Sequence, residues 1–195
     1  TWMFFYDKKK WTHPRIRSFL KAVPDNKLIL LDYYCDHTEI WRNTEKYYGN
    51  PYIWCYLGNF GGNTMIAGNL NDIDFKIKRL FKEGGDNVYG LGATLEGFDV
   101  NPLMYEFVFD QAWDYPVTTD QWITNWSMCR GGNQDANIIK AWRALHQKIY
   151  TEHATCGQSV LMNARPRLTG TKSWNTSPGI HYANNDLWQI WKELL

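Results

Sequence analysis

Short apolar runs alternate with helix-like segments along the first half of the chain. Three runs stand out: LILLDYY (28–34), YIWCYL (52–57) and VYGLGAT (88–94). A continuous apolar run suits a strand that is covered on both faces of a parallel sheet. WMFFY (2–6) is a further candidate for a short strand. Strands that alternate with helices in this way are typical of parallel βα units.

This alternation predicts an α/β fold, namely the C-terminal half of a (β/α)8 TIM-type barrel over residues 1–114. After Pro102 the helical patterns follow one another, with SVLMNARP (159–166) as the one candidate strand, which predicts the beginning of an all-α domain over residues 115–195. A doubly wound open sheet is the alternative. The sequence offers it no support, because neither a GxGxxG fingerprint nor a Walker loop is present.

The predicted helices have recognisable start signals. Thr12 is a plausible N-cap with Pro14 in the first turn behind it, and Thr119 is a plausible N-cap in the second half. The helices are expected over 12–23, 37–49, 72–84, 103–114, 120–129, 135–152 and 186–195.

Composition narrows the classes of function. The net charge of +1 gives no field that favours nucleic acid, and no apolar run reaches the roughly 20 residues of a membrane span. No cysteine or histidine spacing predicts a metal site, and no cofactor is expected. Cys35 and Cys55 lie in apolar runs and are predicted to be buried thiols. The 11 Trp and 12 Tyr residues fit a well-packed core, or a protein that stacks indole faces on sugar rings.

Glu96 is the first candidate for catalysis, because it follows a predicted strand and precedes Gly97. A carboxylate at the carboxyl end of a barrel strand can act as nucleophile or as acid/base, although a solvated turn glutamate has the same spacing. Asp32 ends the run LILLD, where it could orient a sugar hydroxyl or serve only the structure.

Three further residues are candidates for substrate binding. Trp54 and Asn59 belong to WCYLGNFGGN (54–63), whose glycines allow a close backbone approach to a ligand, or simply a tight turn. Asn59 can donate to and accept from hydroxyls. Trp2 could stack on a sugar ring or lie in the core.

Four segments together resemble the α-N-acetylglucosaminidases of glycoside hydrolase family 89. They are IRSFLKAVPDNKLILLD, YIWCYLGNFGGN, LEGFDVNPLMYEF and NTSPGIHYANNDLWQIWKELL, in this order and spacing. The resemblance implies a (β/α)8 barrel followed by an all-α domain. It also implies an exo-acting, retaining hydrolase that releases terminal α-linked N-acetylglucosamine from a glycan.

The resemblance also implies roles for individual residues. Glu96 corresponds to the nucleophile and Trp2 to a tryptophan of the sugar pocket. The acid/base glutamate of the family lies in an Asn-Glu pair, which this sequence does not contain. The chain also opens without Met, so we expect a segment of a longer parent chain that is inactive alone. The family is lysosomal in animals and exported in bacteria.

Two other classes stay open at this stage. A non-catalytic carbohydrate-binding module would use the aromatic residues to bind glycans without turnover. A structural segment would bind no sugar at all.

Overall fold

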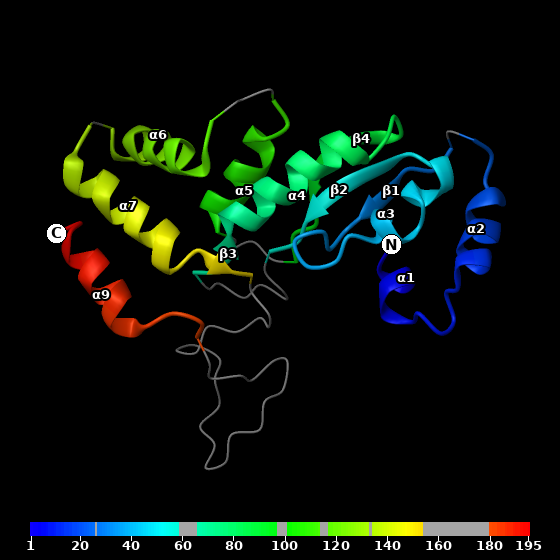
Figure 1. The fold of residues 1–195 in the computed structure, drawn as a ribbon, viewed down its shortest axis with the longest axis horizontal. Coiled ribbons are helices and arrows are strands. Elements are labelled where there is room, and N and C mark those ends of the chain that lie inside the picture. The colour runs from blue at the N-terminus through cyan, green and yellow to red at the C-terminus, as the bar shows by residue number, and fades with distance from the viewer. Residues whose placement is uncertain (26, 59–65, 97–100, 114–116, 133, 154–179) are drawn as a thin grey trace, which may run out of the picture. The chain divides into compact units, whose positions relative to one another are not determined.

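The computed structural model describes residues 1–195 except 26, 59–65, 97–100, 114–116, 133 and 154–179 (Figure 1). The chain divides into two compact units, and neither is continuous in sequence. Unit 1 comprises Thr1–Leu57, Asp72–Leu95 and Val108–Trp113, and unit 2 comprises Gly58–Asn71, Glu96–Phe107 and Asp114–Leu195. A domain boundary near residue 115 therefore stays a prediction. None of the described helices has the length and apolarity that crossing a membrane requires.

A three-stranded parallel sheet forms the centre of unit 1. Its strands are β1 (Leu30–Asp32), β2 (Tyr52–Tyr56) and β4 (Val88–Ala93), in the order β1-β2-β4. The register pairs Asp32 with Trp54, and Trp54 with Leu91. The three predicted parallel strands are thus confirmed, with β1 shorter than its apolar run.

Only one face of this sheet is fully covered by the described residues. Leu30 is 7% exposed, whereas Ile29 and Leu31 on the opposite face are 49% and 46% exposed. The covered face packs against α3 (Ile40–Asn43), since Trp41 stacks on Tyr52 with ring centroids 6.4 Å apart. It is linked to α4 (Leu70–Glu83) through Glu39, which contacts both Trp54 and Arg79. The expectation that both faces of run 28–34 are buried is therefore wrong for the described residues.

Residues 2–6 form a helix, α1 (Trp2–Tyr6), and not the predicted strand. Four of its five residues are aromatic and favour strands, but this preference depends strongly on packing context, and here the contacts of the helix override it. The helix buries Phe4 and stacks Trp2 on Tyr6 one turn later, with ring centroids 5.7 Å apart. The prediction of a helix at 12–23 is confirmed by α2 (His13–Lys21), which has Thr12 as its N-cap.

The predicted helix over 37–49 is interrupted. It consists of α3 and a short 3-10 turn, η1 (Lys46–Gly49). Four consecutive residues, Glu45, Lys46, Tyr47 and Tyr48, have positive φ angles between 48° and 59°. The turn carries Tyr47 into the core, where it is fully buried. Arg17 of α2 braces it, because its guanidinium contacts the Glu45 carboxylate at 3.2 Å and lies 4.4 Å from the centroid of the Tyr48 ring.

Helices dominate the described residues of the second half of the chain. Those with described bounds are α5 (Pro102–Asp110), α6 (Thr119–Gly131), α7 (Ala136–Lys148) and α9 (Asn184–Lys192). The candidate strand at 159–166 lies outside the described residues. α6 and α7 lie side by side (Figure 1). Trp126 of α6 and Trp142 of α7 are in edge-to-face contact, with ring centroids 4.6 Å apart. A small antiparallel pair that the sequence did not predict joins β3 (Gly68–Asn69) to β5 (Thr151–Glu152).

The N-cap of α6 is Thr118, one residue before the predicted Thr119. Its hydroxyl accepts a bond from the backbone N–H of Gln121, and the Gln121 side chain accepts one from the backbone N–H of Thr118. This reciprocal capping box needs Gln three residues after the cap, and that spacing selects Thr118.

Candidate functional site

Backbone and side-chain bonds tie together the carboxyl ends of the three parallel strands. The backbone N–H of Thr94 donates to the Tyr56 carbonyl at 3.0 Å, and the Thr94 hydroxyl donates to the Tyr33 carbonyl at 2.6 Å. The backbone N–H of Cys35 donates to the Cys55 carbonyl at 3.0 Å. The segments that leave β1, β2 and β4 are therefore held at one edge of the sheet.

Glu96 follows this edge closely along the chain. It comes two residues after Thr94, and its side chain is exposed. Chain connectivity thus keeps Glu96 within two residues of the anchored end of β4. Gly97 lies outside the described residues.

Trp2 lies beside the residues that follow β1. Its ring meets Tyr33 edge-on with centroids 4.8 Å apart, and it also contacts Tyr34 at 6.3 Å. Trp2 is nevertheless 44% exposed. The structure therefore combines a fixed indole with free surface, which is the arrangement that stacking on a sugar ring requires.

Asp32 is fully buried at the end of β1. One carboxylate oxygen, Oδ2, accepts a bond from the backbone N–H of Trp41 at 2.9 Å, at the beginning of α3. No bond within normal geometry reaches Oδ1, or the nearby Tyr47 hydroxyl, from any described residue. Burial raises the pKa of the Asp32 carboxyl to about 7, because removal from water disfavours the charged form.

Trp54 lies fully in the core, and its indole N–H donates to Glu39 at 3.1 Å. The same Glu39 oxygen accepts the indole N–H of Trp41, and the other oxygen pairs with Arg79 of α4. Glu39 is 6% exposed, so one buried carboxylate joins two tryptophans and a helix. Sequence reasoning missed this role because Glu39 sits in a polar stretch.

Asp36 is a second buried carboxylate that the sequence did not single out. Its Oδ1 accepts the backbone N–H of Leu57 at 3.1 Å, and Lys76 of α4 donates to its carbonyl. Leu57 follows β2 directly, so Asp36 anchors the chain at the point where the segment WCYLGNFGGN leaves this strand. Asn59 itself lies outside the described residues.

Two further features of the described residues concern metal-ligating side chains and free thiols. No group of three or more His, Cys, Asp or Glu side chains there could hold a metal ion. Cys35 and Cys55 are free and buried, as predicted, and burial is the largest cause that raises the pKa of each thiol.

The described residues define a mixed α/β protein with a parallel sheet followed by helices, in which Trp2 lies beside the residues that leave β1. The model "Alpha-N-acetylglucosaminidase (NAGLU) tim-barrel domain" matches residues 1–115, and the model "Alpha-N-acetylglucosaminidase (NAGLU) C-terminal domain" matches residues 122–195. The chain belongs to the α-N-acetylglucosaminidase family, and the resemblance noted from four segments is confirmed.

Individual relatives agree with this family. The human protein named alpha-N-acetylglucosaminidase is 28% identical over the whole chain, which spans 26% of the relative's own length. A family 89 glycoside hydrolase from Clostridium perfringens, solved with PUGNAc, has a TM-score of 0.79 and 23% identity over 92% of this chain and 21% of its own. CpGH89 from the same organism, solved with its substrate GlcNAc-α-1,4-galactose, has a TM-score of 0.73 and 23% identity over 85% of this chain and 19% of its own. These structures share the fold with this chain.

Proposed function

We propose that this chain supplies the nucleophile of a retaining exo-hydrolase that releases terminal α-linked N-acetylglucosamine from glycans, and that Glu96 is that nucleophile. The observation that carries the proposal is the family match over residues 1–115, within which Glu96 is an exposed carboxylate two residues past the anchored end of β4. Barrel enzymes place their chemistry at such strand ends.

The stereochemistry of the substrate explains why the protein must provide the anion. In an α-glucosaminide the acetamido group and the departing oxygen are cis, so the acetamido oxygen cannot attack from the rear. A carboxylate such as Glu96 would form the bond to the anomeric carbon as the bond to the departing oxygen breaks. A second carboxyl group, about 5–5.5 Å away, would give its proton to that oxygen and then activate water.

Two observations on relatives support a pair of carboxyl groups that is completed outside this chain. CpGH89 with its substrate bound carries two Glu-to-Gln substitutions, as expected if the reaction needs two carboxyl groups. This chain spans only about a quarter of the human relative. We therefore assign the acid/base to another part of a longer protein and expect this chain alone to be inactive.

The remaining candidate residues take different roles in this proposal. Trp2 stacks on the sugar, since 44% of it is exposed. Asp32 and Trp54 are fully buried and act as positioning residues, through Trp41 and Glu39 respectively. Asn59 is proposed to bind a sugar hydroxyl, on the strength of its sequence context alone.

The sheet supports the proposal that residues 1–114 are half of a (β/α)8 barrel. In a closed barrel the face that carries Ile29 and Leu31 would be the interior, and in this chain both side chains are about half exposed. The matches at 1–115 and 122–195 support a boundary near residue 115. Lysosomal or exported localisation stays an expectation from the family.

The test is Glu96→Gln in the longer protein that contains this chain. The variant removes the nucleophile but keeps the shape of the side chain. We expect turnover of an aryl α-N-acetylglucosaminide to fall by about a thousandfold or more, which is about 4 kcal/mol of barrier. Binding of N-acetylglucosamine should stay measurable, and NMR of the wild-type product should show the α anomer first.

The matched control is Glu83→Gln, an exposed glutamate at the end of α4. It should leave the rate unchanged. Turnover near the wild-type value in Glu96→Gln, or initial release of the β anomer, would contradict the proposal.

A carbohydrate-binding module is the second candidate, favoured by the half-exposed Trp2 beside Tyr33 and Tyr34. It predicts that the chain binds terminal N-acetylglucosamine while the longer wild-type protein shows no turnover. Measured hydrolysis by the wild type excludes it.

A further inference from the structure

Asn101 lies directly before α5, five residues after Glu96, and its side-chain amide binds two other segments. The amide nitrogen donates to the Ala67 carbonyl at 3.3 Å and to the Tyr150 hydroxyl at 3.0 Å. The Tyr150 hydroxyl donates in turn to the amide oxygen at 3.3 Å. An Asn side chain offers two N–H donors and an acceptor oxygen, and both kinds of group are used here. Asn101 therefore ties the start of α5 to two distant parts of the chain.

These two parts are the entrances of the small antiparallel strand pair. Ala67 directly precedes β3, and Tyr150 directly precedes β5. The two strands pair with each other, and the Asn69 side-chain amide also donates to the Thr151 carbonyl at 2.6 Å. One side chain, Asn101, thus holds the start of α5 and both strands in a single hydrogen-bonded group.

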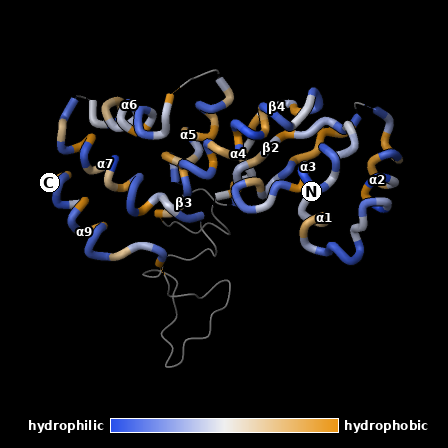
Figure 2. Tube along the Cα trace, in the orientation of Figure 1, coloured by the Kyte–Doolittle hydropathy of each residue, from blue (hydrophilic) through white to orange (hydrophobic). Residues whose placement is uncertain are grey.

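Packing fixes α5 within this group. Leu103, Met104 and Phe107 are at most 1% exposed, and α5 carries long orange stretches in Figure 2. Gly68 of β3 lies so close to α5 that a Cβ atom added there would be 2.4 Å from the Met104 sulfur. Since β3 and α5 are in direct contact, α5 has little freedom to slide past β3, and the bonds of Asn101 join parts that are already rigid.

Tyr150 brings the second half of the chain into this group. Its backbone N–H donates to the Leu145 carbonyl at 2.9 Å, at the end of α7, and the residue is 5% exposed. Burial raises the pKa of the Tyr150 hydroxyl to about 12, because removal from water disfavours the charged form. The hydroxyl therefore keeps its proton, and its bond to Asn101, at neutral and acidic pH.

Glu96 belongs to the same compact unit as these residues. Unit 2 contains Glu96, Ala67, Asn101 and Tyr150, together with α6, α7 and α9. The chain is fixed by Thr94 two residues before Glu96 and by Asn101 five residues after it. A short segment that is held at both ends samples fewer conformations than one that is held at a single end.

We infer that Tyr150 and Asn101 are positioning residues for the Glu96 carboxylate. The inference rests on the proposed function, because it takes Glu96 as the nucleophile. Tyr150 acts through Asn101, and Asn101 acts through the backbone that leads to Glu96. Because a misplacement of about 1 Å can cost on the order of a hundredfold in rate, loss of the Tyr150 hydroxyl should slow the attack and leave sugar binding intact.

Azide separates positioning of Glu96 from a general structural role. In Glu96→Ala of the longer protein, azide can replace the missing carboxylate when the substrate is a dinitrophenyl α-N-acetylglucosaminide. Azide forms the bond to the anomeric carbon as the bond to the departing oxygen breaks, and dinitrophenolate leaves as an anion that needs no proton. The product is a β-glycosyl azide. Because azide diffuses in freely, its attack does not depend on how the backbone before Asn101 is held.

The measured quantity is kcat/KM, which reports the first displacement. We expect Tyr150→Phe to lower it about tenfold when Glu96 is present, with the inhibition constant of N-acetylglucosamine within about twofold of the wild type. In Glu96→Ala with azide, the same change should alter kcat/KM by less than about twofold, since effects that act through one group are not additive. Residual hydrolysis by Glu96→Ala gives the same comparison if azide does not enter. Asn101→Ala should behave alike, and it provides the test if Tyr150→Phe does not fold.

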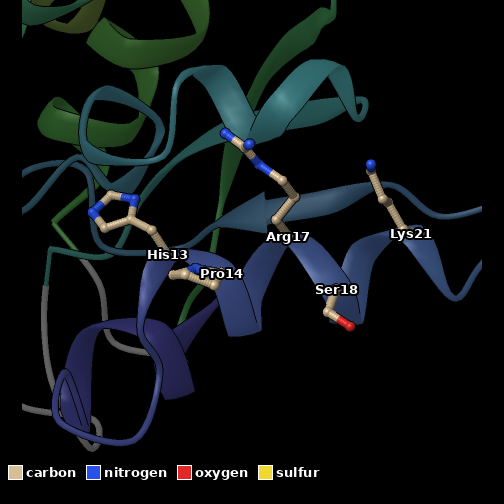
Figure 3. Close-up of a pocket in the computed structure, with 5 residues that line it drawn as sticks. All are labelled: His13, Pro14, Arg17, Ser18 and Lys21. Carbon is tan, nitrogen blue, oxygen red and sulfur yellow. The ribbon is translucent and has the colours of Figure 1, made fainter.

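Two other tyrosines provide matched controls. Tyr48→Phe removes a hydroxyl that contacts His13 Nδ1 at 2.9 Å and donates to the His13 carbonyl at 3.4 Å, at the start of α2 (Figure 3). Tyr52→Phe removes a hydroxyl of a fully buried residue, which donates to the Gly84 carbonyl at 3.1 Å. Neither hydroxyl binds Asn101, so both changes should leave kcat/KM within about twofold, even where the protein becomes less stable.

Three outcomes would overturn the inference and leave the proposed function intact. They are an unchanged kcat/KM in Tyr150→Phe and Asn101→Ala, equal losses with and without the Glu96 carboxylate, and a loss in Tyr48→Phe or Tyr52→Phe as large as in Tyr150→Phe. Failure of the proposed function looks different, because Glu96→Ala would then keep its turnover without azide. The inference would fall with it.

Discussion

Asp32 has a buried carboxyl whose pKa is raised to about 7 from the ordinary 3.8. The folded protein therefore binds a proton that the unfolded chain has already lost between pH 4 and pH 7. The contribution of this carboxyl to the free energy of unfolding is therefore complete below pH 4, and it is lost as the pH rises through 7.

We predict that Asp32→Asn removes this pH dependence. The free energy of unfolding of the wild type should fall between pH 4 and pH 7, relative to the variant, by an amount on the order of 4 kcal/mol. Urea unfolding at several pH values measures it. Parallel profiles for wild type and variant would mean that the carboxyl stays ionised in the fold.

The buried carboxylates also show the limit of sequence reasoning at the scale of residues. Glu96 and Asp32 were singled out because they follow apolar runs whose strand ends are predictable, whereas Trp2 was singled out for its indole ring and by the family resemblance, and its run forms a helix. Asp36 and Glu39 were missed because their partners, Leu57 and Arg79, lie 21 and 40 residues away along the chain. Only the packed sheet and helices bring such groups together.

At the scale of elements, α2 and α6 provide a matched pair of helix starts. Thr12 and Thr118 have nearly the same backbone angles, with φ, ψ of −73°, 157° and −72°, 158°. Only the Thr118 side chain caps its helix. A comparison of the two threonines therefore isolates the energetic contribution of the capping hydrogen bond, because the residue type and backbone conformation are the same at both positions.

We predict that Thr118→Ala lowers the free energy of unfolding by about 1 kcal/mol, the usual value of such a cap. Thr12→Ala should change it by less than about 0.5 kcal/mol, because no capping bond is lost. Denaturant unfolding of both variants gives the comparison. Equal losses would show that the capping bond contributes nothing beyond threonine itself.

Periodicity predicted most elements because an amphipathic helix and a buried strand have different repeats. It failed at residues 2–6, because a short, continuous run of apolar residues fits the repeat of a helix and the repeat of a strand equally well. It failed again at 37–49, because the bracing of Glu45 and Tyr48 by Arg17 is a contact between distant residues. The short β3–β5 pair has too few residues to show a pattern.

At the scale of the whole molecule, the open face of the sheet distinguishes this chain from a closed barrel. Leu30 and Leu31 are adjacent in β1, yet one is 7% and the other 46% exposed. If the longer protein closes the barrel, Leu31 becomes interior there, whereas Leu30 is buried in both.

We therefore predict that Leu31→Ser changes the stability of this chain by less than about 1 kcal/mol, since its side chain is already half in water. In the longer protein the same change should cost about 2–4 kcal/mol, in line with other large-to-small core substitutions. Leu30→Ser should be costly in both. Thermal unfolding of both substitutions, each made in this chain and in the longer protein, measures these losses. A small loss of stability for Leu31→Ser in the longer protein would argue against a closed barrel.

The run from Glu45 to Tyr48 has backbone angles that suit mirror-image amino acids. For natural residues this handedness costs roughly 1–2 kcal/mol at each position, and only glycine escapes the cost. No glycine occupies these four positions, and the turn nevertheless holds Tyr47 fully buried. Chirality and burial thus oppose each other in this turn. Burial of one aromatic side chain contributes about 1.5–3 kcal/mol, less than the roughly 4–8 kcal/mol that four left-handed residues cost. The contacts of Arg17 with Glu45 and Tyr48 are therefore part of what keeps the turn in place.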